Sequence, residues 1–207
     1  MRKLTITIAV AFVSVLTFTA ICAGDFYVIP VGKKNFAPVE KTGQATCYNA
    51  AGEVIDCAGT GQDGSLQAGV GWPDPRFTDN GDGTVTDRLT GLIWTKYLGC
   101  HSGIWQSDLD YCNALATGTC GLTDGSGAGD WRLANHNELL SLLDHSQYMP
   151  ALPAGHPFVV SESANFISST TVVYNPTYAW IVGIYYGTSG TGLKVGSWDG
   201  ACLRGGQ

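Results

Sequence analysis

Six cysteines that follow an apolar leader constrain this chain more than any other feature of its sequence. An even number of cysteines behind a secretory signal is typical of a protein that forms disulfide bonds in an oxidising compartment. Six cysteines can pair in many ways, and the sequence alone does not choose among them. It contains neither a CxxC pair nor an HExxH motif, so no zinc or thiol-redox site is indicated. The six are Cys47, Cys57, Cys100, Cys112, Cys120 and Cys202.

Residues 1–23 are predicted to be a secretory signal peptide. Arg2 and Lys3 supply positive charge, an uncharged apolar run follows, and Ala23 offers a small residue for cleavage. Two alternatives stay open: a retained membrane anchor, for which the run is barely long enough, and a lipoprotein acylated at Cys22. Export predicts a secreted, extracellular or cell-surface protein with no membrane contact once the signal is removed.

The charge of the exported chain argues against some classes of partner. Without residues 1–23 it keeps 9 basic against 17 acidic residues, a formal net charge of −8. An acidic surface disfavours nucleic acids and other polyanions. The 28 glycines and the few charges are typical of a turn-rich, β-rich secreted module.

Residues 24–71 are predicted to be an N-terminal extension before a single domain at 72–207. The extension opens with a short strand that is apolar on both faces, and Pro30 restricts this strand to a sheet edge or end. Such a strand must be buried, either in its own sheet or in a neighbouring chain by strand addition. Its apolar residues are Phe26, Tyr27, Val28, Ile29 and Val31.

Two hairpins are predicted from local signals. Cys47 and Cys57 flank a turn and a short return strand, which indicates a hairpin closed by a disulfide bond. Further along, two β-prone runs flank Asn80-Gly81, a dipeptide that favours tight hairpin turns.

The turn of the second hairpin holds Asp79, Asn80 and Asp82. Their side-chain oxygens are of the type that binds Ca²⁺, but the full spacing and terminal Glu of an EF-hand are missing. Asp and Asn also favour tight turns, because their side chains hydrogen-bond to the local backbone. We favour the turn. Calcium binding, the one cofactor role considered, stays as the alternative.

The stretch 129–144 organises the rest of the chain. Asn135 is placed to cap a helix, and Glu138 can complete a capping box with it. Leucines then recur at helical spacing, so one side of this helix is predicted to face a core. An earlier helix is predicted over 105–116, and strands over 166–171, 178–186, 192–198 and 201–204.

Several ordered motifs of this sequence resemble the bacterial Lcl C-terminal domain family, which is named for the C-terminal domain of a collagen-like adhesin. The resemblance covers about residues 42–207 and lies in "PRFTDNGDGTVTDRLTGLIW", "CGLTDGS", "GDWRLANHNEL", "LPAGHPF", "SST", "YAW" and "RGG". It implies an α+β, C-type-lectin-like fold, related to that of formylglycine-generating enzymes. In such a fold two helices pack on a twisted, mostly antiparallel sheet that disulfide bonds staple.

The same resemblance implies a disulfide pairing. Lectin-like domains often bridge their first helix to their last strand, which would join Cys112 to Cys202. The local hairpin then pairs Cys47 with Cys57, and Cys100 and Cys120 close the segment that holds the first helix.

The function expected from the sequence is that of a non-catalytic recognition or adhesion module. No nucleophile–base order, paired-carboxylate signature or phosphate loop stands out, so we do not expect an enzyme. The partner would be an extracellular glycan or a protein surface. Candidate ligand-binding residues near the C-terminal strands are Tyr185, Tyr186, Trp198 and Asp199, with core or interface packing as the alternative for the aromatic ones.

A second expectation comes from the N-terminal strand at residues 25–31. An apolar strand outside the domain motivates a structural subunit of an extracellular filament or surface assembly. Such a subunit would self-associate by adding that strand to the sheet of its neighbour.

Overall fold

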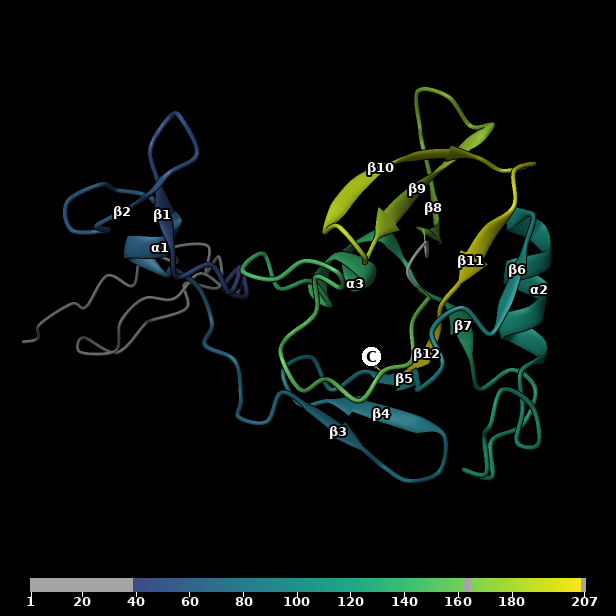
Figure 1. Cartoon of the computed structure of the whole chain (residues 1–207). Coiled ribbons are helices and arrows are strands. Elements are labelled where there is room, and N and C mark those ends of the chain that lie inside the picture. Colours follow the sequence, from purple (N-terminus) through teal and green to yellow (C-terminus); the bar gives the residue numbers. More distant parts are fainter. Residues whose placement is uncertain (1–38, 162–164, 206–207) are drawn as a thin grey trace, which may run out of the picture. The chain divides into compact units, whose positions relative to one another are not determined.

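The computed structural model describes residues 39–161 and 165–205 (Figure 1). The chain divides into two compact units, 1–35 and 36–207, and the described residues all belong to the second. The predicted signal at 1–23 and the predicted strand at 25–31 lie outside the described residues. Within those residues, no helix combines the length and the apolar character needed to cross a membrane.

Most regular structure in the described residues is β, arranged in two five-stranded sheets and one hairpin. The hairpin pairs β1 (Cys47–Tyr48) with β2 (Val54–Ile55). The first sheet has the order β10 (Thr188–Leu193), β9 (Tyr178–Gly183), β8 (Asn165–Thr171), β11 (Trp198–Gly200), β6 (His101–Gly103). The second has the order β3 (Phe77–Asp79), β4 (Thr84–Asp87), β5 (Ile93–Thr95), β12 (Cys202–Arg204), β7 (Arg132–Leu133).

The C-terminal segment connects the two sheets. β11 and β12 are separated by Ala201 alone, so the chain passes directly from one sheet to the other. β8 and β11 pair in parallel, and the other paired strands are antiparallel. The expected mostly antiparallel, β-rich architecture is therefore confirmed.

Three helices occur among the described residues, where two were expected. α2 (Trp105–Ala114) lies alongside β6 and β11, and α3 (His136–Ser141) contacts β8 and β9 (Figure 1). The third, α1 (Asp63–Leu66), is a single turn between β2 and β3. Its sequence, Asp-Gly-Ser-Leu, is too short and too glycine-rich to give a helical pattern.

The capping box predicted for the second helix is confirmed. The Asn135 side chain accepts a hydrogen bond from the Glu138 amide at 2.9 Å, and the Glu138 carboxylate accepts from the Asn135 amide at 2.8 Å. Both bonds satisfy amide donors that a helix start otherwise leaves unpaired. The Glu138 carboxylate also pairs with Arg132, which ties α3 to β7.

One strand prediction is wrong. The sequence suggested a strand over 192–198, but the structure has β10 at Thr188–Leu193, a turn, and β11 at Trp198–Gly200. β10 is rich in Gly, Ser and Thr and lacks the alternation of a half-buried strand. It forms because a short turn after β9 brings it into register with that strand, Thr188 opposite Gly183 and Leu193 opposite Tyr178.

Two clusters of buried apolar side chains hold the sheets and helices together. The larger joins both sheets and α3, and includes Trp94, Val85, Leu139, Phe166 and Leu203. The smaller lies under α2 and includes Cys112, Leu122, Trp131, Leu133 and Cys202. Burying a side chain of this size stabilises a fold by roughly 1.5–3 kcal/mol. Trp131 and Leu133, just before the capped helix, are both buried.

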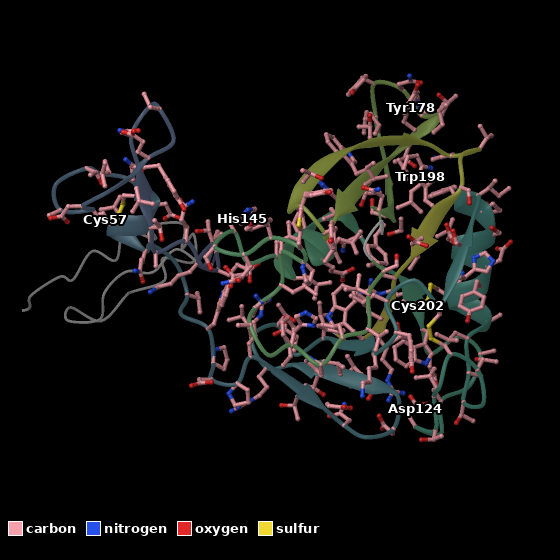
Figure 2. All side chains as sticks on the ribbon, viewed as in Figure 1. Cys57, Asp124, His145, Tyr178, Trp198 and Cys202 are labelled. Atoms are coloured by element: carbon pink, nitrogen blue, oxygen red, sulfur yellow. A yellow bond between two sulfur atoms is a disulfide. The ribbon has the colours of Figure 1, made fainter. Side chains whose placement is uncertain are left out.

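The structure contains three disulfide bonds, and they join the pairs expected from the family resemblance. Cys47–Cys57 closes the β1–β2 hairpin with a Cα–Cα distance of 5.2 Å. Cys100–Cys120 connects two loops at 5.7 Å. Cys112–Cys202 joins α2 to β12 at 5.4 Å, and Cys202 is labelled in Figure 2.

Candidate functional site

A hollow with two tyrosines in its wall lies where three loop segments meet. Its volume is about 630 Å³, and residues from 97–100, 120–121 and 159–161 line it together with Tyr111 of α2. Tyr97 is 49 % exposed and contributes an accessible ring. We call this feature the tyrosine hollow and define it by Tyr97, Cys100, Tyr111, Cys120, Gly121 and Val159.

Backbone pairing and a disulfide bond fix the walls of the tyrosine hollow. The Cys100–Cys120 bond ties the first loop segment to the second. The Leu98 amide donates to the Val159 carbonyl at 3.0 Å, which attaches the third segment. Gly121 has a φ of +75°, and a Cβ there would lie 3.4 Å from the Tyr97 ring. A side chain at this position would therefore strain the backbone and crowd the ring.

A buried carboxylate supports the second tyrosine. Asp108 is fully buried, and its Oδ1 lies 2.7 Å from Nδ1 of His101. The His101 ring stacks on Tyr111 with centroids 4.7 Å apart. Burial raises the pKa of Asp108 to about 6, and the bond to His101 opposes that rise. Burial also raises the pKa of Tyr111, so its phenol stays protonated and able to donate a hydrogen bond.

The four predicted ligand-binding residues occupy two separate places. Tyr185 and Tyr186 lie in the turn before β10, with Tyr186 62 % exposed. Trp198 and Asp199 lie on β11, after the other end of β10. Six residues of extended strand span roughly 20 Å. The structure therefore does not bring the two pairs together into one site.

Trp198 packs against the chain rather than standing free. Its Nε1 donates to the Leu193 carbonyl at 2.8 Å, and its ring covers Gly192 and Gly196, where a Cβ would meet it at 2.5 and 2.8 Å. Leu193, whose carbonyl accepts this bond, pairs with Tyr178 of β9, and Trp198 and Tyr178 are both labelled in Figure 2. These contacts favour packing for Trp198, the alternative that the sequence left open.

Asp199 lies behind the wall of the tyrosine hollow. A Cβ on Gly99, a residue of that wall, would be 3.5 Å from the Asp199 carboxylate. Burial raises the pKa of Asp199, while hydrogen bonds from the Ser102 side chain and the Asn165 backbone lower it. Among the four predicted residues, Asp199 is thus next to the hollow.

The side chains considered for calcium are engaged within their own hairpin. Asp79 accepts from the Gly81 amide at 3.0 Å and pairs with Lys96 at 2.7 Å. Asp82 accepts from the Thr84 amide at 3.0 Å and from its hydroxyl at 2.6 Å. The described residues contain no group of three or more His, Cys, Asp or Glu side chains placed to hold a metal ion. These contacts account for both aspartates at the turn, and calcium binding remains a prediction to test.

The sequence did not single out Tyr97 or Tyr111. Tyr97 lies three residues before a cysteine, and Tyr111 lies next to Cys112 on the predicted helix. An aromatic residue beside a disulfide cysteine is a weak signal, because such residues are more often core.

Fold and site together define a disulfide-bonded, mostly β module with a partly aromatic hollow on its surface. The chain belongs to the Lcl C-terminal domain family, which matches residues 83–204 and so includes the whole tyrosine hollow. This family suggests a surface- or adhesin-associated module. A search of curated proteins finds no match.

Proposed function

We propose that this chain is an exported, non-catalytic recognition or adhesion module that binds a glycan in the tyrosine hollow. The observation that carries the proposal is that Tyr97 and Tyr111 both line one hollow of about 630 Å³. Small-ligand sites are typically about 300–1,000 Å³. The C–H face of a sugar ring packs on an aromatic ring, and phenol groups can hydrogen-bond to its hydroxyls.

The negative charge of the chain favours a neutral glycan as the ligand. The exported chain carries a formal net charge of −8, and the Asp199 carboxylate lies beside Gly99 in the wall of the hollow. Sulfated or uronic-acid polymers would be repelled by such a surface, as would nucleic acids. Neutral sugars are the class that this site suits. We infer in addition that the two sheets, α2 and α3 form the C-type-lectin-like fold that the family resemblance implies.

A glycan array tests this proposal. The secreted, oxidised protein should bind a set of neutral glycans. A separate measurement of its intact mass should place its first residue near Gly24 or Asp25. Near-UV circular dichroism confirms that the applied protein is folded. Folded protein that binds no glycan above background would overturn the proposal.

The second candidate, a subunit of an extracellular assembly, is favoured by the exposed edge of the first sheet. β10 is an outer strand and pairs with β9 alone among the described strands. An outer strand offers unpaired backbone groups to an added strand such as 25–31. Filaments in negative-stain images of the native material, lost on deletion of 25–31, would support this candidate over the first.

A further inference from the structure

The outer strand β10 of the first sheet carries no protection against pairing with another strand. Among the described strands it pairs with β9 alone (Figure 1). It has six residues, whereas the outer strands β6, β3 and β7 have three, three and two. Proteins usually block an outer strand by shortness, proline, charge or a bulge, because its unpaired backbone groups attract other strands. β10 contains no proline or charged residue, and its register with β9 has no bulge.

The contacts at the end of β10 show which of its backbone groups face outward. The Lys194 amide donates to the Thr177 carbonyl at 2.9 Å, which makes Leu193 and Tyr178 a pair without mutual hydrogen bonds. Pairs with and without such bonds alternate along an antiparallel ladder. Every second residue of β10, counted back from Leu193, therefore turns its amide and its carbonyl away from β9.

Two of these outward residues are free to pair with a partner strand. The carbonyl of Leu193 already accepts from the Gly196 amide at 2.9 Å and from Trp198 Nε1 at 2.8 Å. Ser189 and Thr191 are exposed, and within 39–161 and 165–205 their outward amides and carbonyls have no partner. An added strand would therefore bond to these two residues.

The sequence around β10 lacks negative charge. Residues 163–198 contain no Asp or Glu, and Lys194 is their one charged residue. The exported chain as a whole has 9 basic against 17 acidic residues, so two copies repel each other over most of their surface. β8, β9 and β10 all come from the stretch without carboxylates. Two copies of this acidic chain can thus approach through the β10 edge with little repulsion.

We infer that β10 pairs with β10 of a second copy of this chain, antiparallel across a two-fold axis at Gly190. In this register Ser189 of one copy lies opposite Thr191 of the other, and both pairs exchange their outward amide and carbonyl bonds. The pairing joins the two five-stranded sheets into one. Both copies contribute the same patch, as a two-fold interface requires.

Apolar side chains at both ends of β10 fit the same register. Leu193 of one copy lies opposite Gly187 of the other, next to Tyr186. Leu193 is 43 % exposed and Tyr186 is 62 % exposed, so pairing brings two accessible apolar side chains to each end of the interface. Interface packing, the alternative that the sequence left open for Tyr186, would then be its role.

This inference does not depend on the glycan proposed for the tyrosine hollow, which takes no lining residue from β10. It also differs from the second candidate function, in which residues 25–31 add to a sheet edge. One edge accepts one strand, so the two occupants of β10 exclude each other.

Sedimentation velocity of the secreted, oxidised chain measures the association. The wild type should sediment as a dimer, and so should a variant that lacks residues 25–31. A monomer at every soluble concentration would overturn the inference. A dimer that disappears with residues 25–31 would overturn it too, because the strand at the edge would then be the N-terminal one. Neither outcome bears on glycan binding.

Thr191 provides a pair of variants that tests the backbone bonds. Thr191→Pro removes an outward amide and leaves the bonds to β9 in place, a position where proline is tolerated on an outer strand. The dissociation constant of the dimer should rise roughly tenfold or more, because both copies lose a bond. Thr191→Val keeps the amide and should match the wild type. Equal constants for the two variants, with native near-UV circular dichroism, would contradict the pairing.

Gly190 tests the register. A Cβ there would lie 3.8 Å from the Ile181 side chain, an ordinary contact, so the folded chain accepts a side chain at this position. Gly190→Lys and Gly190→Glu each place like charges opposite one another across the axis and should weaken the dimer roughly fivefold. A mixture of the two variants should associate more tightly than either alone, and Gly190→Ala should match the wild type. A mixture no tighter than its components would contradict the axis at Gly190.

Discussion

Single buried side chains set much of the chemistry of this protein at the scale of the residue. Asp108 holds His101, and the ring of His101 stacks on Tyr111, so one buried carboxylate helps to orient a tyrosine of the tyrosine hollow. Arg76 is held in a comparable way, because the carboxylates of Asp87 and Glu40 pair with its guanidinium. In both places a charged group is paired on one side, as buried charges must be.

Glu40 gives a residue-scale prediction about pH. Burial raises its pKa from 4.5 to about 7, although Arg76 opposes this and Asp87 adds to it. Its contribution to stability is therefore fully present below pH 4.5 and is lost as the pH rises through 7. In Glu40→Gln, the fall in unfolding free energy between those pH values should be shallower than in the wild type, by up to about 1.4 kcal/mol per pH unit.

The pH dependence of urea unfolding for the two proteins measures this difference. The comparison isolates Glu40, because Asp108, Asp199, His136 and His156 titrate alike in both. Parallel pH profiles would show that Glu40 titrates as an ordinary surface carboxyl.

A second residue-scale prediction concerns calcium. Asp79 and Asp82 hydrogen-bond within the hairpin, so replacing both with alanine should lower the melting temperature by the same amount with calcium as with a chelator. Scanning calorimetry of both proteins in both conditions provides the test. A calcium-induced rise in the wild type that the double variant lacks would establish the metal site instead.

Helix caps and disulfide bonds determine stability at the scale of the element. α3 has six residues and depends on its capping box, since so short a helix gains little from propensity alone. α2 is fixed differently, by Cys112–Cys202 and by the bond from Trp105 Nε1 to the Ser168 carbonyl at 2.9 Å.

The capping box predicts unequal effects for two asparagines in one stretch. Asn135→Ala should lower the unfolding free energy by about 1 kcal/mol, because it leaves the Glu138 amide without its acceptor. Asn137→Ala, an exposed site in the same helix, should change it by less than about 0.5 kcal/mol. Chemical denaturation measures both, and losses of equal size would mean that the cap is not a stabilising element.

Two disulfide bonds are predicted to differ in importance. Cys112–Cys202 spans 90 residues, which corresponds to about 4.6 kcal/mol in the chain-entropy model. Cys47–Cys57 spans 10 residues, for which the model gives about 3 kcal/mol. Replacing Cys112 and Cys202 with alanine should therefore lower the melting temperature more than replacing Cys47 and Cys57.

Non-reducing peptide mapping accompanies that comparison. A Cys112–Cys120 or Cys100–Cys202 peptide would refute the pairing and the packing of α2 on β12. A larger effect from the hairpin pair would show that the chain-entropy argument fails here.

At the scale of the whole molecule, local sequence patterns predict some features of the fold and miss others. The capping box at Asn135, the Asn80-Gly81 hairpin and the hairpin between Cys47 and Cys57 depend on neighbours within a few residues, and pattern and turn chemistry predict them. β10 escaped prediction because its pairing with β9 comes from the turn between them rather than from its own residues.

The tyrosine hollow and the surroundings of Arg76 both depend on contacts between distant parts of the chain. The tyrosine hollow combines residues near 97, 111, 121 and 159, and Arg76 meets Glu40, Asp87 and Ser141. No local sequence pattern predicts these contacts, because they follow from the order of the strands and from the Cys100–Cys120 disulfide bond. The tyrosine hollow and the contacts of Arg76 are thus properties of the assembled sheets and loops.

The affinity of the tyrosine hollow for the strongest neutral glycan found on the array tests the central claim most directly. Isothermal titration calorimetry should give a dissociation constant about tenfold higher for Tyr97→Ala than for the wild type, because the variant loses the accessible ring of the hollow. Tyr174→Ala, which removes a tyrosine 82 % exposed and outside the hollow, should match the wild type. Equal constants for all three proteins would contradict the account.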